Sequence, residues 1–263
     1  MNTLDCWSSF INTTLEQTER SELIEILGML TKALELQSIN YMLSDGSLIG
    51  SYRHHGFIPW DLDVDIEISM NDKARTIGLI SSLNGFKYSQ IWSQQFHVHK
   101  LNSFYPNVDI WFYKENATHG FSPDGHIWLQ QLVFPLIKRP FENLRLFVPF
   151  CTKAFIESEY PGFENICLQI EKWRGLNRPR ATCRTNCSEL FAKFPFVFRE
   201  GIEILNENFT YHSDTFPLFP LNSSFEYGIT QNFSTTLTTG NEIEIEILKF
   251  ANKTIQTIEI KMN

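Results

Sequence analysis

The sequence has no broad excess of basic residues. Its 263 residues include 22 Lys and Arg against 30 Asp and Glu, which gives a formal net charge of −8. Proteins that bind nucleic acid draw much of their affinity from basic groups that neutralise backbone phosphates. The composition therefore predicts no nucleic-acid partner, and any phosphate site must be local.

Long apolar runs are also missing. No uninterrupted stretch approaches the roughly 18 residues that a membrane helix needs. The residues after Met1 show no basic start followed by an apolar core, so the sequence as written carries no recognisable signal peptide. We expect membrane contact only through an anchor that the sequence does not include. Hydrophobic residues make up 43% of the chain, enough to exclude a disordered protein.

Motifs for N-glycosylation are more frequent than the composition would give by chance. They begin at Asn12, Asn116, Asn186, Asn208, Asn222, Asn232 and Asn252. Acceptors of this type are used in proteins that enter the secretory pathway. The excess predicts a glycoprotein of the secretory lumen, or a secreted one, with a cytoplasmic location as the weaker alternative.

The cysteines are few and odd in number. Besides Cys6 the chain has Cys151, Cys167, Cys183 and Cys187. Four thiolates could hold zinc, but only the last two have the close spacing that zinc sites usually show at both ends. In an oxidising compartment, two disulfides among these four, with Cys6 left as a thiol, is the preferred interpretation.

Hydrophobic periodicity predicts a mixed α+β domain over residues 14–175. Apolar residues spaced three and four apart indicate an amphipathic helix over 14–36. We expect further helices at 47–53, 72–83, 151–159 and 163–173, and strands at 39–43, 63–70, 86–92, 96–101 and 108–113.

The pattern changes after this domain. Residues 176–201 are rich in Arg and polar groups and are predicted to form a linker. In the last part of the chain Ile243, Ile245 and Ile247 alternate with glutamates, which is typical of strands with one solvated face. We therefore expect residues 202–263 to form a β-rich tail or a partial sandwich.

Asp61, Asp63 and Asp65 alternate with apolar residues. In an extended chain their carboxylates share one face, with successive Cα atoms about 6.5 Å apart. Two such anions repel by roughly 3 kcal/mol at an effective dielectric constant near 20. A divalent cation would turn that repulsion into binding, and hard oxygen ligands suit Mg²⁺ or Mn²⁺.

Two other interpretations of the triplet are open. A calcium loop of the EF-hand type begins with the same pattern, but here Ile66 stands in place of the sixth-position Gly and Asp72 in place of the twelfth-position Glu. A solvated acidic strand face is the second alternative.

Neighbouring residues add to the metal interpretation. Gly46 and Ser47 lie in a turn that opens a helix, where exposed backbone N–H groups could bind a phosphate. Asp109 lies on a later apolar strand that could place a further carboxylate beside the first ones. A phosphate cradle with three or more converging acids is the arrangement that metal-assisted phosphoryl transfer needs.

The segment G-S-L-I-G-S-Y-R-H-H-G-F-I-P-W-D-L-D-V-D-I, residues 46–66, resembles the signature of the LicD/fukutin family, roughly G-T-L-L-G-x-x-R-H-x-x-x-I-P-W-D-x-D-x-D-[IL]. The matching positions are Gly46, Gly50, Arg53, His54, Ile58, Pro59, Trp60, Asp61, Asp63 and Asp65. The V-D-I-W-F segment around Asp109 and residues 134–160 also resemble the family, so the likeness covers residues 23–160.

The resemblance implies a nucleotidyltransferase-type fold, with a mixed sheet and flanking helices. It further implies transfer of a phosphorylated alcohol, of the ribitol phosphate or choline phosphate type, from a CDP-linked donor to a hydroxyl of a glycan or glycoprotein. In animals such acceptors are met in the Golgi, which is the location that we expect.

The same resemblance assigns roles residue by residue. Asp61, Asp63 and Asp65 would hold the metal and the donor diphosphate, and Gly46 and Ser47 would cradle phosphate. Asp63, Asp65 and Asp109 are the expected catalytic acids. Arg53 could pair with a phosphate oxygen or form a buried ion pair, and His54 could orient the donor or be structural. Two further functions share these acids: nucleotidyl transfer that releases pyrophosphate, and glycan binding without catalysis.

Overall fold

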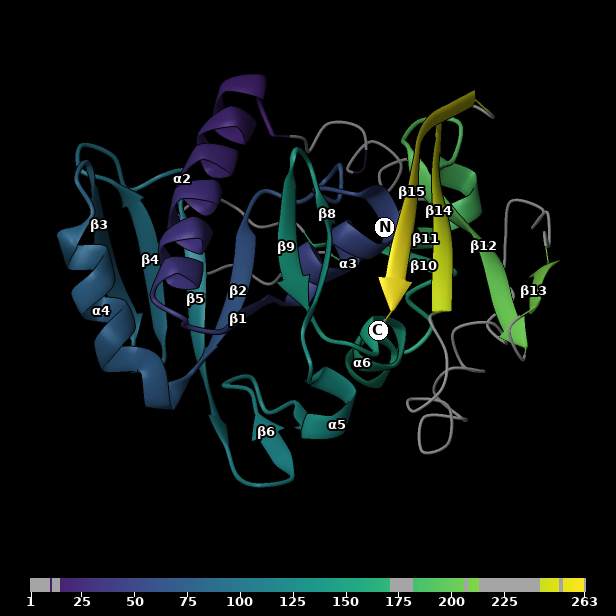
Figure 1. Cartoon of the computed structure of the whole chain (residues 1–263). Helices are drawn as coiled ribbons and strands as arrows, with labels where there is room; N and C mark the ends of the chain where they lie inside the picture. The colour runs from purple at the N-terminus through teal and green to yellow at the C-terminus, as the bar shows by residue number, and fades with distance from the viewer. Residues whose placement is uncertain are drawn as a thin grey trace.

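The computed structural model describes residue 10 and residues 15–170, 182–205, 208–212, 242–250 and 253–262. Its centre is a mixed sheet in the order β1-β2-β5-β4-β3 (Figure 1). The strands are β1 (Tyr41–Leu43), β2 (Val64–Ser69), β3 (Phe86–Trp92), β4 (Gln95–Lys100) and β5 (Val108–Glu115). Only the central pair, β2 and β5, is parallel among the neighbours in this order. The short strands β6 (His119–Phe121) and β7 (Ile127–Leu129) extend the sheet from β5.

Helix α2 (Gln17–Leu36) covers this sheet with one apolar face. Leu23, Ile26, Leu27, Leu30 and Leu34 are all buried, at the three- and four-residue spacing of a helix. Helix α4 (Lys73–Ser82) follows the 3₁₀ turn η1 (Met70–Asp72) and lies beside α2 (Figure 1). Within the described ranges, no helix combines the length and the apolar character that crossing a bilayer would require.

Helix α3 (Asp45–His54) is the most deeply buried helix near the sheet, and every residue from Ser47 to His54 is buried. Close packing explains why residue 50 is a glycine: a methyl group there would lie 2.3 Å from the backbone oxygen of Gly56. Only glycine lets the chain pass this close to the helix. The motif's second glycine is therefore a packing requirement.

The remaining elements of the predicted domain close over α3. They are α5 (Gln130–Val133), the hairpin of β8 (Ile137–Phe141) and β9 (Leu144–Val148), and α6 (Thr152–Glu159). Strand β9 runs beside β1, and α6 packs against α3. Together with the central sheet, these elements form the mixed α+β architecture that the sequence predicts.

The prediction of a helix at 163–173 is wrong for residues 163–170, the part of this range that the structure describes. Residues Ile166–Ile170 form strand β10, which pairs with β11 (Thr182–Asn186) and is followed by the 3₁₀ turn η2 (Cys187–Leu190). Along β10, Cys167 and Gln169 are buried while Leu168 is exposed, which is the alternation of a strand. Residues 182–190, expected in a linker, are thus folded onto the domain.

The cysteines differ in part from the expected pairing. Cys167 and Cys187 form a disulfide, and Cys183 is disulfide-bonded as well. Cys151 is a buried thiol outside any disulfide, so its predicted role as a disulfide partner is wrong. Cys6 lies outside the described residues. Disulfide bonding of three of the four thiols also excludes the zinc alternative.

The predicted β-rich tail is present in the described C-terminal residues. A four-stranded antiparallel sheet has the order β13-β12-β14-β15. It is built from β12 (Phe196–Leu205), β13 (Asn208–His212), β14 (Glu242–Phe250) and β15 (Lys253–Met262). The start of β12 packs beside α3, so this sheet is joined to the domain through its first strand.

Candidate active site

Two of the predicted acids lie side by side at the centre of the sheet. Asp65 on β2 and Asp109 on β5 are register partners across the parallel strand pair, so their side chains leave the same face. Neighbouring strands are about 4.8 Å apart, which brings two carboxylates within reach of one cation. Each of these aspartates is only 8% exposed.

Asp109 is held by three polar side chains that sequence reasoning did not assign. Gln95 donates to its Oδ2 at 3.1 Å, Asn107 donates to its Oδ1 at 2.5 Å, and Nε2 of His97 lies 3.3 Å from the same Oδ1. His97 is the register partner of Asp109 on β4. No sequence spacing reveals this contact, because it depends on strand pairing.

Asp65 is fixed through both its side chain and its backbone. The indole Nε1 of Trp111 donates to Oδ1 of Asp65 at 3.1 Å. The backbone N–H of Asp65 donates to Oγ of Ser47 at 2.9 Å. Ser47 therefore joins the start of α3 to β2, and its predicted contact with phosphate stays a prediction.

Asp61 lies against the start of α3. A methyl group built on Gly46 would stand 2.2 Å from Oδ2 of Asp61, so this carboxylate occupies the space that any side chain at position 46 would need. One oxygen of Asp61 accepts the backbone N–H of Leu62 at 3.0 Å. The motif's first glycine and first aspartate are thus one local arrangement at the positive end of a helix.

Asp63 directly precedes β2 and is half-buried. It stands two residues before Asp65, so it continues the same row of side chains in extended chain. The described residues hold one set of three metal-ligating side chains within 4.8 Å of one another, and none of Asp61, Asp63, Asp65 and Asp109 belongs to it. A cation bound to these acids would therefore be held by fewer than three carboxylates at once. Phosphate oxygens of the donor and water would complete its coordination shell.

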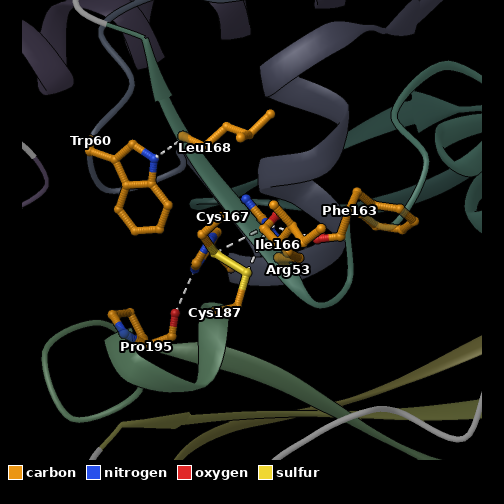
Figure 2. Close-up of a disulfide and its surroundings, with 9 residues drawn as sticks. Arg53, Trp60, Phe163, Ile166, Cys167, Leu168, Cys187 and Pro195 are labelled. Atoms are coloured by element: carbon orange, nitrogen blue, oxygen red, sulfur yellow. Dashed lines mark hydrogen bonds between the residues drawn. A yellow bond between two sulfur atoms is a disulfide. The ribbon is translucent and has the colours of Figure 1, made fainter. Parts of the chain in front are cut away.

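Arg53 is buried away from solvent on the opposite end of α3 (Figure 2). Its Nη1 donates to the backbone oxygen of Phe163 at 3.0 Å and lies 3.4 and 3.3 Å from the sulfurs of Cys167 and Cys187. Desolvation lowers the pKa of this guanidinium to about 9. These contacts make Arg53 an anchor for the disulfide hairpin, by which we mean strands β10 and β11 with the Cys167–Cys187 bond. They support neither of the two roles predicted for Arg53.

His54 is also buried, and its contacts are structural. Nδ1 lies 2.6 Å from the backbone oxygen of Pro195, and the ring packs at 4.5 Å on Phe196. Burial, with a smaller effect of the Arg53 charge, lowers the pKa of this imidazole well below its ordinary value. The neutral ring therefore donates to Pro195 through Nδ1, and these contacts favour the structural alternative.

Trp60 anchors the segment that carries the acids. Its Nε1 donates to the backbone oxygen of Leu168 at 2.8 Å (Figure 2), and its ring packs against Phe10 and Phe194. Since Trp60 immediately precedes Asp61, this contact fixes where the acidic row begins.

Residues 38–150 match the family model for LicD/FKTN/FKRP, nucleotidyltransferase domain. The chain is 29% identical over 148 residues to human FKRP, named ribitol 5-phosphate transferase. This match covers 49% of this chain and 29% of FKRP. The chain is also 33% identical over 76 residues to Haemophilus influenzae LicD, named lipopolysaccharide cholinephosphotransferase. This match covers 29% of this chain and 24% of LicD.

The chain thus spans less than a third of the length of these two relatives. Among solved structures, the antibiotic adenylyltransferase ANT(2")-Ia shows a likeness with a TM-score of 0.38 at 9% identity, over 52% of this chain and 78% of that one. The family model, the complete motif and the acids on β2 and β5 agree, and residues 38–150 form a nucleotidyltransferase domain of the LicD/fukutin family.

Proposed function

We propose that this protein is a divalent-metal-dependent transferase that moves a phosphorylated alcohol from a CDP-linked donor to a glycan hydroxyl. The observation that carries the proposal is the pairing of Asp65 with Asp109 within a domain of this family. Relatives named as transferases of ribitol phosphate and choline phosphate support the class of reaction.

The acids fit Mg²⁺ or Mn²⁺ by their chemistry. Asp65 and Asp109 are adjacent and almost fully buried, so their charges repel unless a cation or proton intervenes. Asp63 and Asp61 would add ligands from the half-buried end of the row. A bound metal would neutralise charge on the donor diphosphate and lower the barrier to displacement at phosphorus.

In the proposed reaction the acceptor hydroxyl attacks the phosphorus that carries the alcohol. A new phosphorus–oxygen bond forms to the glycan, and the bond to the bridging diphosphate oxygen breaks, so that CMP leaves. The hydroxyl proton passes to Asp109, whose carboxylate is oriented by Gln95, Asn107 and His97. Trp111 donates to Oδ1 of Asp65 and so fixes the orientation of this second carboxylate on the same face of the sheet.

The start of α3 is the proposed place for the donor phosphates. Because Gly46 has no side chain, the carboxylate of Asp61 lies directly beside the first turn of this helix. Helix N-termini favour negative charge by a few tenths to about 1 kcal/mol. Binding there would set the diphosphate next to the row of acids.

A panel of donors tests the proposal and separates it from nucleotidyl transfer. The full chain is incubated with Mg²⁺ or Mn²⁺, a glycan acceptor, and either CDP-alcohols or nucleoside triphosphates. Metal-dependent release of CMP from a CDP-alcohol is the expected result. Release of pyrophosphate from a triphosphate would support nucleotidyl transfer instead, and binding of glycan without either product would support a glycan-binding protein.

We further propose that the protein works in the secretory lumen, in the Golgi, and is N-glycosylated. Among the motif residues, Asn116 and Asn186 are exposed on the described surface. Asn186 immediately precedes the disulfide-bonded Cys187, which we expect to hinder its modification. The structure does not describe the side chains of the other five motif asparagines. Expression in animal cells followed by enzymatic removal of N-glycans tests this location, and an unchanged mobility on a gel would contradict it.

A further inference from the structure

The hairpin of β6 and β7 has one apolar face turned to solvent. Phe121 and Ile127 are register partners across this hairpin, and Leu129 lies two residues beyond Ile127. Their side chains share one face, because alternate residues of a strand point the same way. Phe121 is 36%, Ile127 58% and Leu129 38% exposed, whereas Trp128 on the other face is 2% exposed. Apolar side chains gathered on one exposed face mark a surface that meets a partner.

A glycosylation motif lies at the edge of this apolar face. Asn116 directly follows β5, and Thr118 supplies the hydroxyl of the motif. The backbone N–H of Asn116 donates to the backbone oxygen of His119 at 2.9 Å, so these two residues close the turn between β5 and β6. His119 is in turn the register partner of Leu129 on β7. The motif therefore lies beside the apolar residues.

Strand pairing also decides on which side of the sheet Asn116 lies. Lys114 of β5 is the register partner of Phe121, so these two side chains leave the same face. Asn116 stands two residues after Lys114 and continues that row. Asp109 lies an odd number of positions before Lys114 on the same strand, so its side chain leaves the opposite face. A glycan on Asn116 is thus attached on the apolar side of the hairpin and away from the acids of the candidate active site.

The side chain of Asn116 is held by its amide oxygen. This oxygen accepts the backbone N–H groups of Thr118 and His119 at 2.9 and 2.8 Å, and Oγ1 of Thr118 at 3.1 Å. Backbone N–H groups only donate, so the atom that they share is the oxygen and not the nitrogen. Within the described part of the chain nothing accepts a hydrogen bond from Nδ2, and the residue is exposed. The atom that carries an N-glycan is therefore accessible in the fold.

We infer that Asn116 carries an N-glycan and that this glycan covers the apolar face formed by Phe121, Ile127 and Leu129. The inference rests on the lumenal location proposed above. The co-reactant is an oligosaccharide joined to a lipid diphosphate, used by the oligosaccharyl transferase of the lumen. Nδ2 forms a bond to the anomeric carbon of the oligosaccharide, the bond from that carbon to the diphosphate oxygen breaks, and Nδ2 loses one proton as the lipid diphosphate leaves.

A tethered glycan suits this surface chemically. A pyranose ring carries C–H groups on its faces and hydroxyls around its rim, so it packs on an aromatic ring such as Phe121 and keeps its hydroxyls in water. Because the glycan is covalently attached beside the hairpin, its effective concentration there is high and weak contacts suffice. Among the described strands β7 pairs only with β6, so the uncovered hairpin would offer both an apolar face and an open strand edge to other copies.

Mass spectrometry of the full chain tests the modification. The chain is produced in animal cells behind a cleavable signal peptide, which brings it into the lumen whatever its natural location. Enzymatic removal of an N-glycan converts the modified Asn to Asp, so the peptide that contains residue 116 reports its own modification. We expect conversion at Asn116 in wild type and in Thr118→Ser, which keeps the motif, and none in Thr118→Ala. An unmodified Asn116 in wild type overturns the inference, even where other motifs are modified.

Binding of the dye ANS to the folded protein tests the covering. This dye becomes fluorescent on exposed apolar surface. Thr118→Ala should give more fluorescence and more self-association than Thr118→Ser, and the further changes Ile127→Thr and Leu129→Thr should remove the excess. Should Thr118→Ala fail to fold, glycans are removed enzymatically from folded wild type and from Ile127→Thr/Leu129→Thr, and the rise should be larger in wild type. An equal signal in the members of either pair overturns the covering.

The chain produced without an added signal peptide separates this inference from the proposed location. No N-glycan on that chain, with Asn116 modified when the signal is present, would contradict the lumenal location and support the site. Neither readout uses transfer activity. A failure of the transferase proposal therefore leaves both results unchanged.

Discussion

Asp65 and Asp109 come from strands 44 residues apart in sequence and meet as register partners across the parallel pair of β2 and β5. Each carboxylate is held by its own donor groups: Trp111 for Asp65, and Gln95, Asn107 and His97 for Asp109. Two buried anions held this close are a standing cost to the metal-free fold. That cost is the physical argument for a cation at this point.

Replacing Asp63 or Asp65 should abolish transfer and leave the fold intact. We expect Asp63→Asn and Asp65→Asn each to lower turnover by about two orders of magnitude or more, because each removes a metal ligand. Without metal, their melting temperatures should hold or rise, since a repulsive charge is gone. Glu25→Gln, an exposed residue paired with Lys100, is the matched control and should keep its activity. Near-normal turnover in Asp63→Asn or Asp65→Asn would contradict the metal assignment.

The glycines of the motif should respond differently to alanine. Gly50→Ala puts a methyl group 2.3 Å from a backbone oxygen that cannot move away, so it should destabilise the protein by roughly 1–3 kcal/mol. Gly46→Ala meets only the carboxylate of Asp61, which can rotate, so it should impair activity more than stability. Gly78→Ala, on an exposed face of α4 with open space around it, should stabilise by about 0.5–1 kcal/mol. Denaturant unfolding of the three variants distinguishes these outcomes.

The disulfide hairpin should be needed for stability of the family domain. Cys167→Ser with Cys187→Ser is expected to cost about 2–5 kcal/mol, because the bond closes the β10–β11 hairpin and packs on Arg53. A reducing agent should lower the melting temperature of wild type at least as much as the double substitution does, because it also breaks the disulfide of Cys183. Cys151→Ser, at a buried thiol outside the disulfides, should leave the response to reducing agent unchanged. An equal melting temperature with and without the bond would contradict this account.

His54 should make stability depend on pH. Its pKa in the fold lies well below that of the unfolded chain, so the unfolded chain binds the proton first as the pH falls. The stability that the neutral ring contributes is present above about pH 6.5 and is lost at up to about 1.4 kcal/mol per pH unit below it. Unfolding free energies at pH 7.5 and 5.5 should therefore differ more in wild type than in His54→Gln. Equal pH dependence in the two proteins would show that His54 titrates normally.

Local patterns predicted much of the fold. The period of α2 and the bounds of β3 could be predicted, because helix and strand spacing are properties of short segments. The sequence also predicted that Asp109 would lie beside the acidic row, and it is the register partner of Asp65. The segment 166–170 was wrongly expected to be helical, since a short apolar run does not distinguish helix from strand, and its strand pairs with residues 182–186.

The partners of the acids were beyond sequence reasoning. Gln95, His97 and Trp111 reach Asp109 and Asp65 only through strand register, which short segments do not encode. Arg53 was expected either to pair with a phosphate oxygen or to form a buried ion pair, yet its place within α3 directs it to the backbone oxygen of Phe163 and the sulfur of Cys167. Connectivity among five cysteines likewise depends on the tertiary structure.

Phosphorus NMR of a single reaction mixture tests the central claim most directly. The full chain, a CDP-alcohol, a glycan acceptor and Mg²⁺ are followed over time, and EDTA is added to a parallel sample. We predict that a phosphodiester signal and the CMP signal rise together at the expense of the diphosphate, and that EDTA or the Asp65→Asn substitution stops both. A phosphodiester that forms at an unchanged rate in EDTA, or in Asp65→Asn, would contradict metal-dependent transfer at the Asp65 and Asp109 pair.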